Sequence, residues 1–333
     1  MKPADQTSFD EIEPYEVGFA SHYDQHLKPL VRKFENSRQD AVKKFKKRLV
    51  GAIILTPIVL FLSFYIPFVV IDLDPETFWG DIFVWWFIGF VGGVATFVYS
   101  SIGNYKGSIK QEIFPRIISF LGEYSFDAEI ENQMKRFESS QIVPKYHKET
   151  SEDRTTGTYK GVNIEFFETQ LERRKWTSKT RNHKTIFDGV VISLSVKKSF
   201  EGQTIVLRDR GRFRNFLKSK FVTSLEKAGL EDPKFEKIFE VFTNDQVEAR
   251  YLLTTSFMER LLELNDVFEG KGVQCSFYQD TLLIMIPSEK DFFEAGSIFK
   301  REDFIDDAKA LLKEMNLIFS VIDILKLDQD IGL

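Results

Sequence analysis

Residues 49–71 have the sequence LVGAIILTPIVLFLSFYIPFVVI, and residues 82–102 have the sequence IFVWWFIGFVGGVATFVYSSI. Neither stretch contains a charged side chain. Because a helix rises about 1.5 Å per residue, each stretch is long enough to cross a hydrocarbon core of about 30 Å. The alternative, a buried hairpin in a water-soluble core, rarely contains uncharged stretches of this length. The two stretches therefore predict two N-terminal transmembrane helices.

The residues that flank these stretches predict the orientation of the helix pair. Five basic residues lie within residues 43–48, whereas the connecting loop, residues 72–81, contains four acidic residues and no basic one. Lys106, Lys110 and Arg116 follow the second stretch. Because basic residues stay on the cytoplasmic side of a membrane, we expect both termini in the cytoplasm and the acidic loop on the far side.

The helix pair divides the chain into three predicted parts. They are an N-terminal cytoplasmic segment, residues 1–48, the transmembrane hairpin, residues 49–102, and a cytoplasmic domain, residues 103–333. Apolar residues of the first part recur at spacings of three and four from Phe9 to Phe45, which predicts amphipathic helical pieces. Their apolar stripe must be covered either by the protein's own cytoplasmic domain or by a partner helix.

The cytoplasmic domain contains patterns of both strands and helices. Apolar residues at helical spacing predict a helix over residues 109–137. A polar, turn-rich passage is expected over residues 150–157. Alternation of apolar and polar residues predicts strands within residues 162–166, 190–196 and 204–207. Two further strands, residues 273–277 and 282–286, are expected to form a hairpin around a short YQDT connection.

Two helices are expected late in the chain. Ser256 and Glu259 have the spacing of a capping box, and Phe257 and Leu261 begin one apolar face of the helix that follows. Another helix is expected from about Asp303. Strands that come first, helices that are interspersed late and the absence of a βαβ rhythm predict an α+β domain with an antiparallel sheet.

The composition excludes several classes of protein. The 333 residues include 45 basic and 50 acidic side chains, and this balance argues against a nucleic-acid-binding protein. The single cysteine, Cys275, cannot form an internal disulfide, and with four histidines it cannot build a Cys-rich zinc site. It alternates with Val273 and Phe277 on a predicted strand, so we expect a buried packing thiol. No phosphate-binding glycine loop or catalytic motif occurs, so we expect neither metal nor cofactor.

One polar block is the candidate for chemistry. Asn244, Asp245, Glu248 and Arg250 could converge on a ligand as weak catalytic candidates, or they could cap a helix and form structural pairs. We favour the structural interpretation, because no metal set or partner base accompanies them. The sequence thus argues more against an enzyme than for one, and the question stays open.

Gly89 and Gly93 form a GxxxG step in the second apolar stretch. Such a step lets another helix backbone approach closely. Packing of the second span on the first and a seam between two copies of the chain explain it equally well.

A basic segment between two predicted strands forms a candidate surface for anionic lipid. For an exposed loop tethered at a membrane, attraction to lipid headgroups is one interpretation and a solvated tip is the other. Nucleic-acid binding is weaker still, because few aromatic residues are interleaved. The basic residues are Arg173, Arg174, Lys175, Lys179, Arg181 and Lys184.

Five sequence blocks, in this order and spacing, resemble the bacterial family called domain of unknown function 3137. The resemblance implies a membrane anchor of two N-terminal spans and no known activity, and it identifies no catalytic residues. The match extends from about Tyr105 to Leu327. The blocks are FESSQIVP (137–144), SEDRTTGTYKGVNIEFFETQL (151–171), TIFDGVV (185–191), KSFEGQTIVLRD (198–209) and FEKIFEVFTNDQVEARYLLTTSFMERLLEL (235–264).

These observations predict an integral, multi-pass protein of the bacterial inner (plasma) membrane. Its cytoplasmic α+β domain is expected to act as an interaction module for a protein partner or a second copy of the chain, and for anionic lipid. The alternative is a membrane-anchored enzyme or ligand-binding domain that uses the polar block, residues 244–250.

Overall fold

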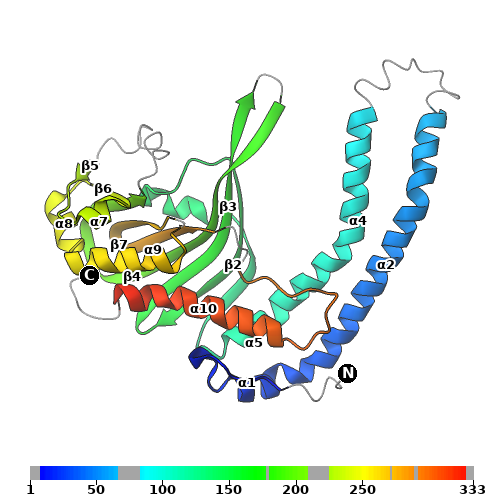
Figure 1. Ribbon diagram of the computed structural model, residues 1–333, viewed down its shortest axis with the longest axis horizontal. Coiled ribbons are helices and arrows are strands. Elements are labelled where there is room, and N and C mark those ends of the chain that lie inside the picture. The colour runs from blue at the N-terminus through cyan, green and yellow to red at the C-terminus, as the bar shows by residue number, and fades with distance from the viewer. Residues whose placement is uncertain are drawn as a thin grey trace. The chain divides into compact units, whose positions relative to one another are not determined.

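The computed structural model describes residues 8–66, 83–177, 180–208, 225–270, 272–288 and 292–327 (Figure 1). The chain forms two compact units. The first unit consists of Met1–Arg116 and Ala295–Ala308, and the second consists of Ile117–Glu294 and Lys309–Leu333. This division by packing differs from the predicted division by topology, because a short segment late in the chain packs with the N-terminal helices.

The first unit is helical. Its two long helices, α2 and α4, are antiparallel neighbours (Figure 1). Pro29 lies in the first turn of α2, where its missing N–H has no partner to lose. The elements are η2 (Pro14–Glu16), α1 (Phe19–His26), α2 (Lys28–Tyr65), α4 (Phe83–Glu112) and α5 (Phe114–Ile118), which crosses the unit boundary.

The protein's own chain covers the predicted N-terminal apolar stripe. Tyr23 and Phe34 are buried on α1 and α2. The Tyr23 hydroxyl donates a hydrogen bond to the Asp303 carbonyl at 2.8 Å, and the Phe34 ring lies 5.4 Å from the Phe304 ring. Of the two alternatives for the stripe, the first is therefore found. Ile12 is an exception and stays 74% exposed.

The second unit is built on an antiparallel sheet, which confirms the predicted α+β class. In the described residues the sheet has seven strands in the order β1-β2-β3-β4-β6-β5, and β7 pairs with β4. The strands are β1 (Ser125–Ile130), β2 (Lys148–Tyr159), β3 (Val162–Thr177), β4 (Thr180–Arg208), β5 (Glu226–Ala228), β6 (Phe239–Thr243) and β7 (Gln274–Pro287).

Apolar side chains are buried on both faces of this sheet. On one face Phe167 and Val191 pack against the short helix η5 (Met134–Ser140). On the other, the Phe277 ring contacts Phe257 of α9 at 5.8 Å. Figure 1 shows α9 and α10 crossing in front of the strands. The remaining helices are α7 (Pro233–Glu236), α8 (Gln246–Leu252), α9 (Thr255–Val267) and α10 (Ile305–Leu325).

The expected helix over residues 109–137 is wrong in its middle. α4 ends at Glu112, and β1 occupies Ser125–Ile130. α5 continues the helical part to Ile118, and Gly122, with a φ of 136° that favours glycine, lies in the turn between α5 and β1. Pairing with β2 then places the following residues in the sheet.

The polar passage over residues 150–157 is also wrong, because these residues belong to β2. Ser151, Asp153 and Thr155 point into the buried side of the sheet. The Ser151 hydroxyl lies 2.8 Å from the Thr169 hydroxyl on β3. A strand whose buried face is polar lacks the apolar alternation that sequence analysis depends on.

The expected hairpin around the YQDT connection is wrong as well. β7 runs without reversal along β4, from Cys275 opposite Val206 to Pro287 opposite Gly189. Gln279 has a φ of 54° and lies where the register shifts, so the turn residues form an irregularity in one strand. In the same way, the predicted strands 190–196 and 204–207 are two parts of β4.

The late helices were predicted correctly except at their first residues. Phe257 and Leu261 of α9, and Met315 and Ile322 of α10, are buried as expected. The N-cap of α9 is Thr254, whose hydroxyl accepts from the Phe257 amide at 3.3 Å, in place of Ser256.

Candidate functional site

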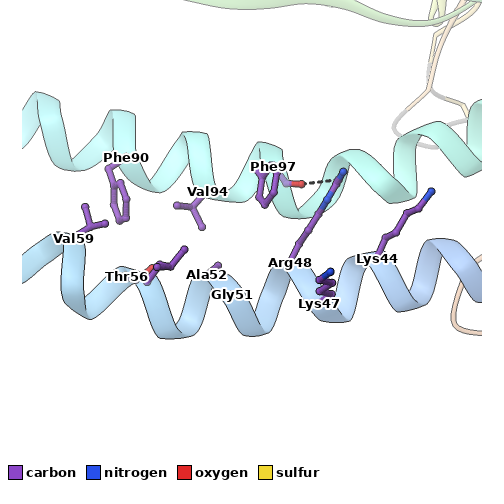
Figure 2. Close-up of a pocket in the computed structure, with 11 residues that line it drawn as sticks. Lys44, Lys47, Arg48, Gly51, Ala52, Thr56, Val59, Phe90, Val94 and Phe97 are labelled. Carbon is purple, nitrogen blue, oxygen red and sulfur yellow. Dashed lines mark hydrogen bonds between the residues drawn. The ribbon is translucent and has the colours of Figure 1, made fainter.

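A groove of about 540 Å³ lies between α2 and α4 (Figure 2). In Figure 2 the side chain of Val59 faces Phe90, and Val94 points between the two helices. Most of the residues that line the groove are apolar, and three basic residues lie at one end of it. The lining residues are Lys44, Lys47, Arg48, Gly51, Ala52, Leu55, Thr56, Val59, Phe90, Val94 and Phe97.

Arg48 lines the basic end of the groove. Its Nη1 donates to the Phe97 carbonyl at 3.0 Å and to the Ser100 hydroxyl at 2.5 Å, so it joins α2 to α4. Its guanidinium also lies 4.7 Å from the centre of the Phe97 ring. Lys44 and Lys47 are exposed beside it, and in the described part of the chain neither forms an ion pair.

Both long helices present apolar side chains outward. Ile53 and Phe61 of α2 are 63% and 65% exposed, and Trp85 of α4 is 73% exposed. Among the described residues, one helical stretch, Trp85–Ile118, is long and apolar enough to cross a membrane, and 11% of its apolar window is buried. A core helix of a water-soluble domain would be mostly buried.

The glycines of α4 have open space around them. A Cβ atom built at Gly89, Gly92 or Gly93 would meet no atom within 4 Å. Both interpretations of the GxxxG step, packing on the first span and a seam between two copies of the chain, therefore stay predictions.

A buried cluster of polar residues fastens the late segment to α2. Arg38 Nη2 lies 2.7 Å from Glu35 Oε1, and their side chains are 13% and 14% exposed. Arg38 Nη1 donates to the Ile298 carbonyl at 2.7 Å, and Glu35 Oε2 accepts from the Glu302 amide at 3.0 Å. The hydrogen bond from Arg38 lowers the pKa of Glu35 to about 2, so this ion pair stays charged.

The same segment is bound to α4 through Tyr105. Its hydroxyl donates to Glu302 Oε2 at 2.6 Å, and both residues are buried. Burial, together with this hydrogen bond, raises the pKa of Tyr105, so its hydroxyl remains a donor.

Asp307 completes the cluster as a second buried carboxyl group. Its Oδ1 accepts from the Gly296 amide at 2.6 Å. Burial and the neighbouring Glu302 carboxylate raise the pKa of Asp307 to about 7. We call Glu35, Arg38, Tyr105, Glu302 and Asp307 the carboxyl cluster.

Asp307 makes the stability of the first unit depend on pH. Its pKa rises from 3.8 to about 7 on folding, so between these values the folded chain holds a proton that the unfolded chain has lost. Unfolding free energy should therefore increase as pH falls from above 7 toward about 4. Glu35, whose pKa is lowered from 4.5 to about 2, adds the opposite dependence only as pH falls below about 4.5. We expect a change on the order of 4 kcal/mol, measured by thermal unfolding of the full chain across this range.

Asp307→Asn keeps the acceptor for the Gly296 amide and removes the titration, so this variant should lose most of the pH dependence. Asp306→Asn is the matched control, because the Asp306 side chain is 82% exposed. An unchanged profile in Asp307→Asn, or the same loss in the control, would contradict the assignment.

The structure places three members of the polar block on backbone amides. Asp245 caps α8 by accepting from Val247 and Glu248 amides at 2.9 Å each. The Glu248 carboxylate accepts from the Gly202 amide at 2.8 Å, and Asn244 Oδ1 accepts from the Gln203 amide at 2.6 Å. These side chains hold the 201–203 bend of β4 against α8, whereas Arg250 is exposed.

The basic segment is a paired hairpin and not the expected loop. β3 and β4 remain paired up to Thr177 opposite Thr180, and Figure 1 shows this ribbon projecting from the sheet. Arg173, Arg174 and Lys184 are exposed, and Lys179 lies outside the described residues. No described contact shows what this hairpin binds.

Cys275 lies inside the sheet with 1% of its surface exposed, as expected for a packing thiol. Burial raises its pKa, which keeps the thiol protonated. Among the described residues, no group of three His, Cys, Asp or Glu side chains could hold a metal ion.

Sequence analysis missed the carboxyl cluster entirely. Its members come from α2, from α4 and from a segment almost 200 residues further along, with Tyr105 and Glu302 197 positions apart. Each residue alone is an ordinary polar residue of a helix or loop, so no local sequence pattern predicts that these residues form a cluster.

This protein is therefore an α+β protein with an antiparallel sheet and helices packed against it. The same chain carries two long helices that are rich in apolar residues. The family model described as "Protein of unknown function (DUF3137)" matches residues 185–327. Over these residues the match confirms the resemblance found in the sequence.

One solved structure, the "crystal structure of the mycobacterial trehalose monomycolate transport factor A, TtfA", shows a distant similarity. It is 12% identical, the similarity covers 65% of this chain and 94% of that chain, and the TM-score is 0.33. A similarity at this level carries no argument about fold or function. No curated protein shows significant sequence similarity to the chain.

Proposed function

We propose that the chain is an integral protein of a bacterial inner membrane, in which α2 and α4 span the bilayer and the α+β unit serves as a cytoplasmic interaction module. The observation that supports this best is the outward exposure of large apolar side chains on both helices. Exposing them to water would cost about 25 cal/mol per Å² of apolar surface, and a lipid environment removes that cost.

The charges at the ends of the two helices support the orientation. The basic residues 43–48 precede the apolar part of α2, and Lys106 and Lys110 follow that of α4. The hydrogen bond from Arg48 to Ser100 places these two ends at one level. All these basic residues would therefore lie on the cytoplasmic side.

The geometry of the polar block supports an interaction module over an enzyme. Asn244, Asp245 and Glu248 already accept hydrogen bonds from backbone amides. The open glycine face of α4 and the exposed basic hairpin instead offer surfaces for a second copy of the chain or another protein.

Labelling of single cysteines in intact bacterial cells tests the two spans. In a Cys275→Ser background, Glu76→Cys should react with a membrane-impermeant maleimide added outside the inner membrane. Ser37→Cys, which is exposed on α2 before the apolar stretch, should react only after the cells are permeabilised. Reaction of both positions from the same side would contradict the two-span topology.

Native mass spectrometry of the full-length protein extracted from its own membrane tests the interaction module. A stoichiometric second polypeptide or a dimer would support it. A monomer with no bound protein under gentle extraction would count against it.

A further inference from the structure

We propose that the groove between α2 and α4 binds one anionic glycerophospholipid of the cytoplasmic leaflet, with its phosphate at Lys44 and Lys47 and one acyl chain along the apolar wall. This inference rests on the two membrane spans proposed above. It concerns a site distinct from the basic hairpin of the sheet.

The shape of the groove suits a single chain of lipid. Its volume of about 540 Å³ lies within the range of about 300–1,000 Å³ typical of small-molecule sites. A helix about 10 Å across would occupy roughly 1,200 Å³ over the same length, so a helix of a second copy does not fit inside it. An acyl chain is narrower and needs no polar partner along Ala52, Leu55 and Val94.

The depth of the groove matches one leaflet of a bilayer. From Arg48 to Val59 there are 11 residue steps along α2, which is about 16 Å at about 1.5 Å per residue. Half of a hydrocarbon core of about 30 Å is about 15 Å. A lipid whose phosphate lies at the basic end would therefore end its acyl chain near Val59 and Phe90.

The charges at the mouth of the groove favour an anionic lipid over a zwitterionic one. Arg48 is occupied by the Phe97 carbonyl and the Ser100 hydroxyl. Lys44 and Lys47 are exposed at the same end and form no ion pair with any described carboxylate. By contrast, Lys43 on the same helix lies 3.6 Å from Asp40 and is not part of the groove. The two free ammonium groups are thus placed to bind a phosphate that carries net negative charge.

The experiment uses the full-length protein reconstituted in vesicles of phosphatidylcholine that contain phosphatidylglycerol as the minor lipid. Native mass spectrometry then measures which lipid stays bound. The unmodified protein should retain one phosphatidylglycerol in preference to phosphatidylcholine. Lys44→Gln with Lys47→Gln should lower this preference roughly 30-fold, as expected for two basic residues worth about 1 kcal/mol each.

A control of equal charge is Lys43→Gln with Lys46→Gln, because neither residue lines the groove. This control should keep the preference for phosphatidylglycerol.

A second test, Gly51→Leu, fills the groove without changing charge, since a Cβ at Gly51 meets no atom within 4 Å. It should expel the lipid, whereas Gly103→Leu, also in open space but outside the groove, should not.

Flotation of the protein with the vesicles tests the proposed membrane spans independently of the proposed lipid site. A protein that does not float contradicts the proposed spans. A protein that floats but binds the two lipids in their bulk ratio, or a dimer without bound lipid, overturns the lipid site and leaves the spans standing. Equal losses in the test variant and in the control variant of equal charge would overturn it as well.

Discussion

Gly189→Ala is expected to destabilise the sheet unit by about 4 kcal/mol or more, an effect large enough to prevent folding of a marginally stable domain. Gly189 lies in the middle of β4, between Thr169 of β3 and Pro287 of β7. A Cβ there would lie 2.2 Å from the Ile286 carbonyl oxygen and 2.7 Å from the Ser288 amide nitrogen. Because these are backbone atoms of a paired strand, they cannot move without separating β7 from β4.

Substitutions of two other glycines distinguish the effect of the steric clash at Gly189 from the effect of an unusual backbone conformation on stability. Gly161 has a φ of 82° but open space around it, so Gly161→Ala should cost only about 1–2 kcal/mol. Gly229 has open space and no unusual φ, so Gly229→Ala should change stability by less than about 0.5 kcal/mol.

Denaturant unfolding of the full-length protein in detergent measures this series. If Gly189→Ala does not fold, its absence from the soluble detergent extract, with both control variants present, is the expected result. A Gly189→Ala protein as stable as Gly229→Ala would show that β7 is not held against β4 as described.

Arg38→Met is expected to destabilise the helical unit by about 3–5 kcal/mol. The guanidinium pairs with Glu35 and binds the Ile298 carbonyl, and both charged side chains are largely buried. Removing one member of a buried pair leaves the other charge uncompensated, which costs far more than losing an exposed pair. Segment 295–308 should therefore lose its hold on α2.

The same helix offers a matched comparison. Lys43 and Asp40 have the same spacing as Arg38 and Glu35, but their side chains are 75% and 66% exposed. Lys43→Met should cost less than about 1 kcal/mol. Hydrogen exchange of residues 295–308 in the full-length protein measures both variants. Equal protection in Arg38→Met and Lys43→Met would refute the role of the carboxyl cluster.

Local patterns predicted a large part of this fold. The apolar stripe of α1 and α2, the buried faces of α9 and α10, and the alternation in β3 and β4 all follow from the spacing of apolar residues along one element. Each of these elements packs one face against a core, so its own residues carry the signal.

The same patterns failed wherever a distant partner decided the outcome. β2 is polar on its buried side, and it is a strand because its backbone pairs with β1 on one side and β3 on the other. Residues 278–281 have the composition of a turn, but β4 pairs with the chain on both sides of them and keeps β7 extended. Turn residues therefore indicate a hairpin only when the chain offers no strand that is long enough to pair with the residues on both sides of them.

The sequence by itself determined the two long apolar stretches, the charges at their ends, the α+β class and the resemblance to the family over residues 185–327. These depend on composition and on residues close together in the chain. Tertiary structure alone decided where the late segment 295–308 lies, which carboxyl groups meet at Glu302 and Asp307, and that a groove with a basic mouth opens between α2 and α4. Contacts between residues far apart in sequence create these features, because burial and charge depend on neighbours that only the folded chain brings together.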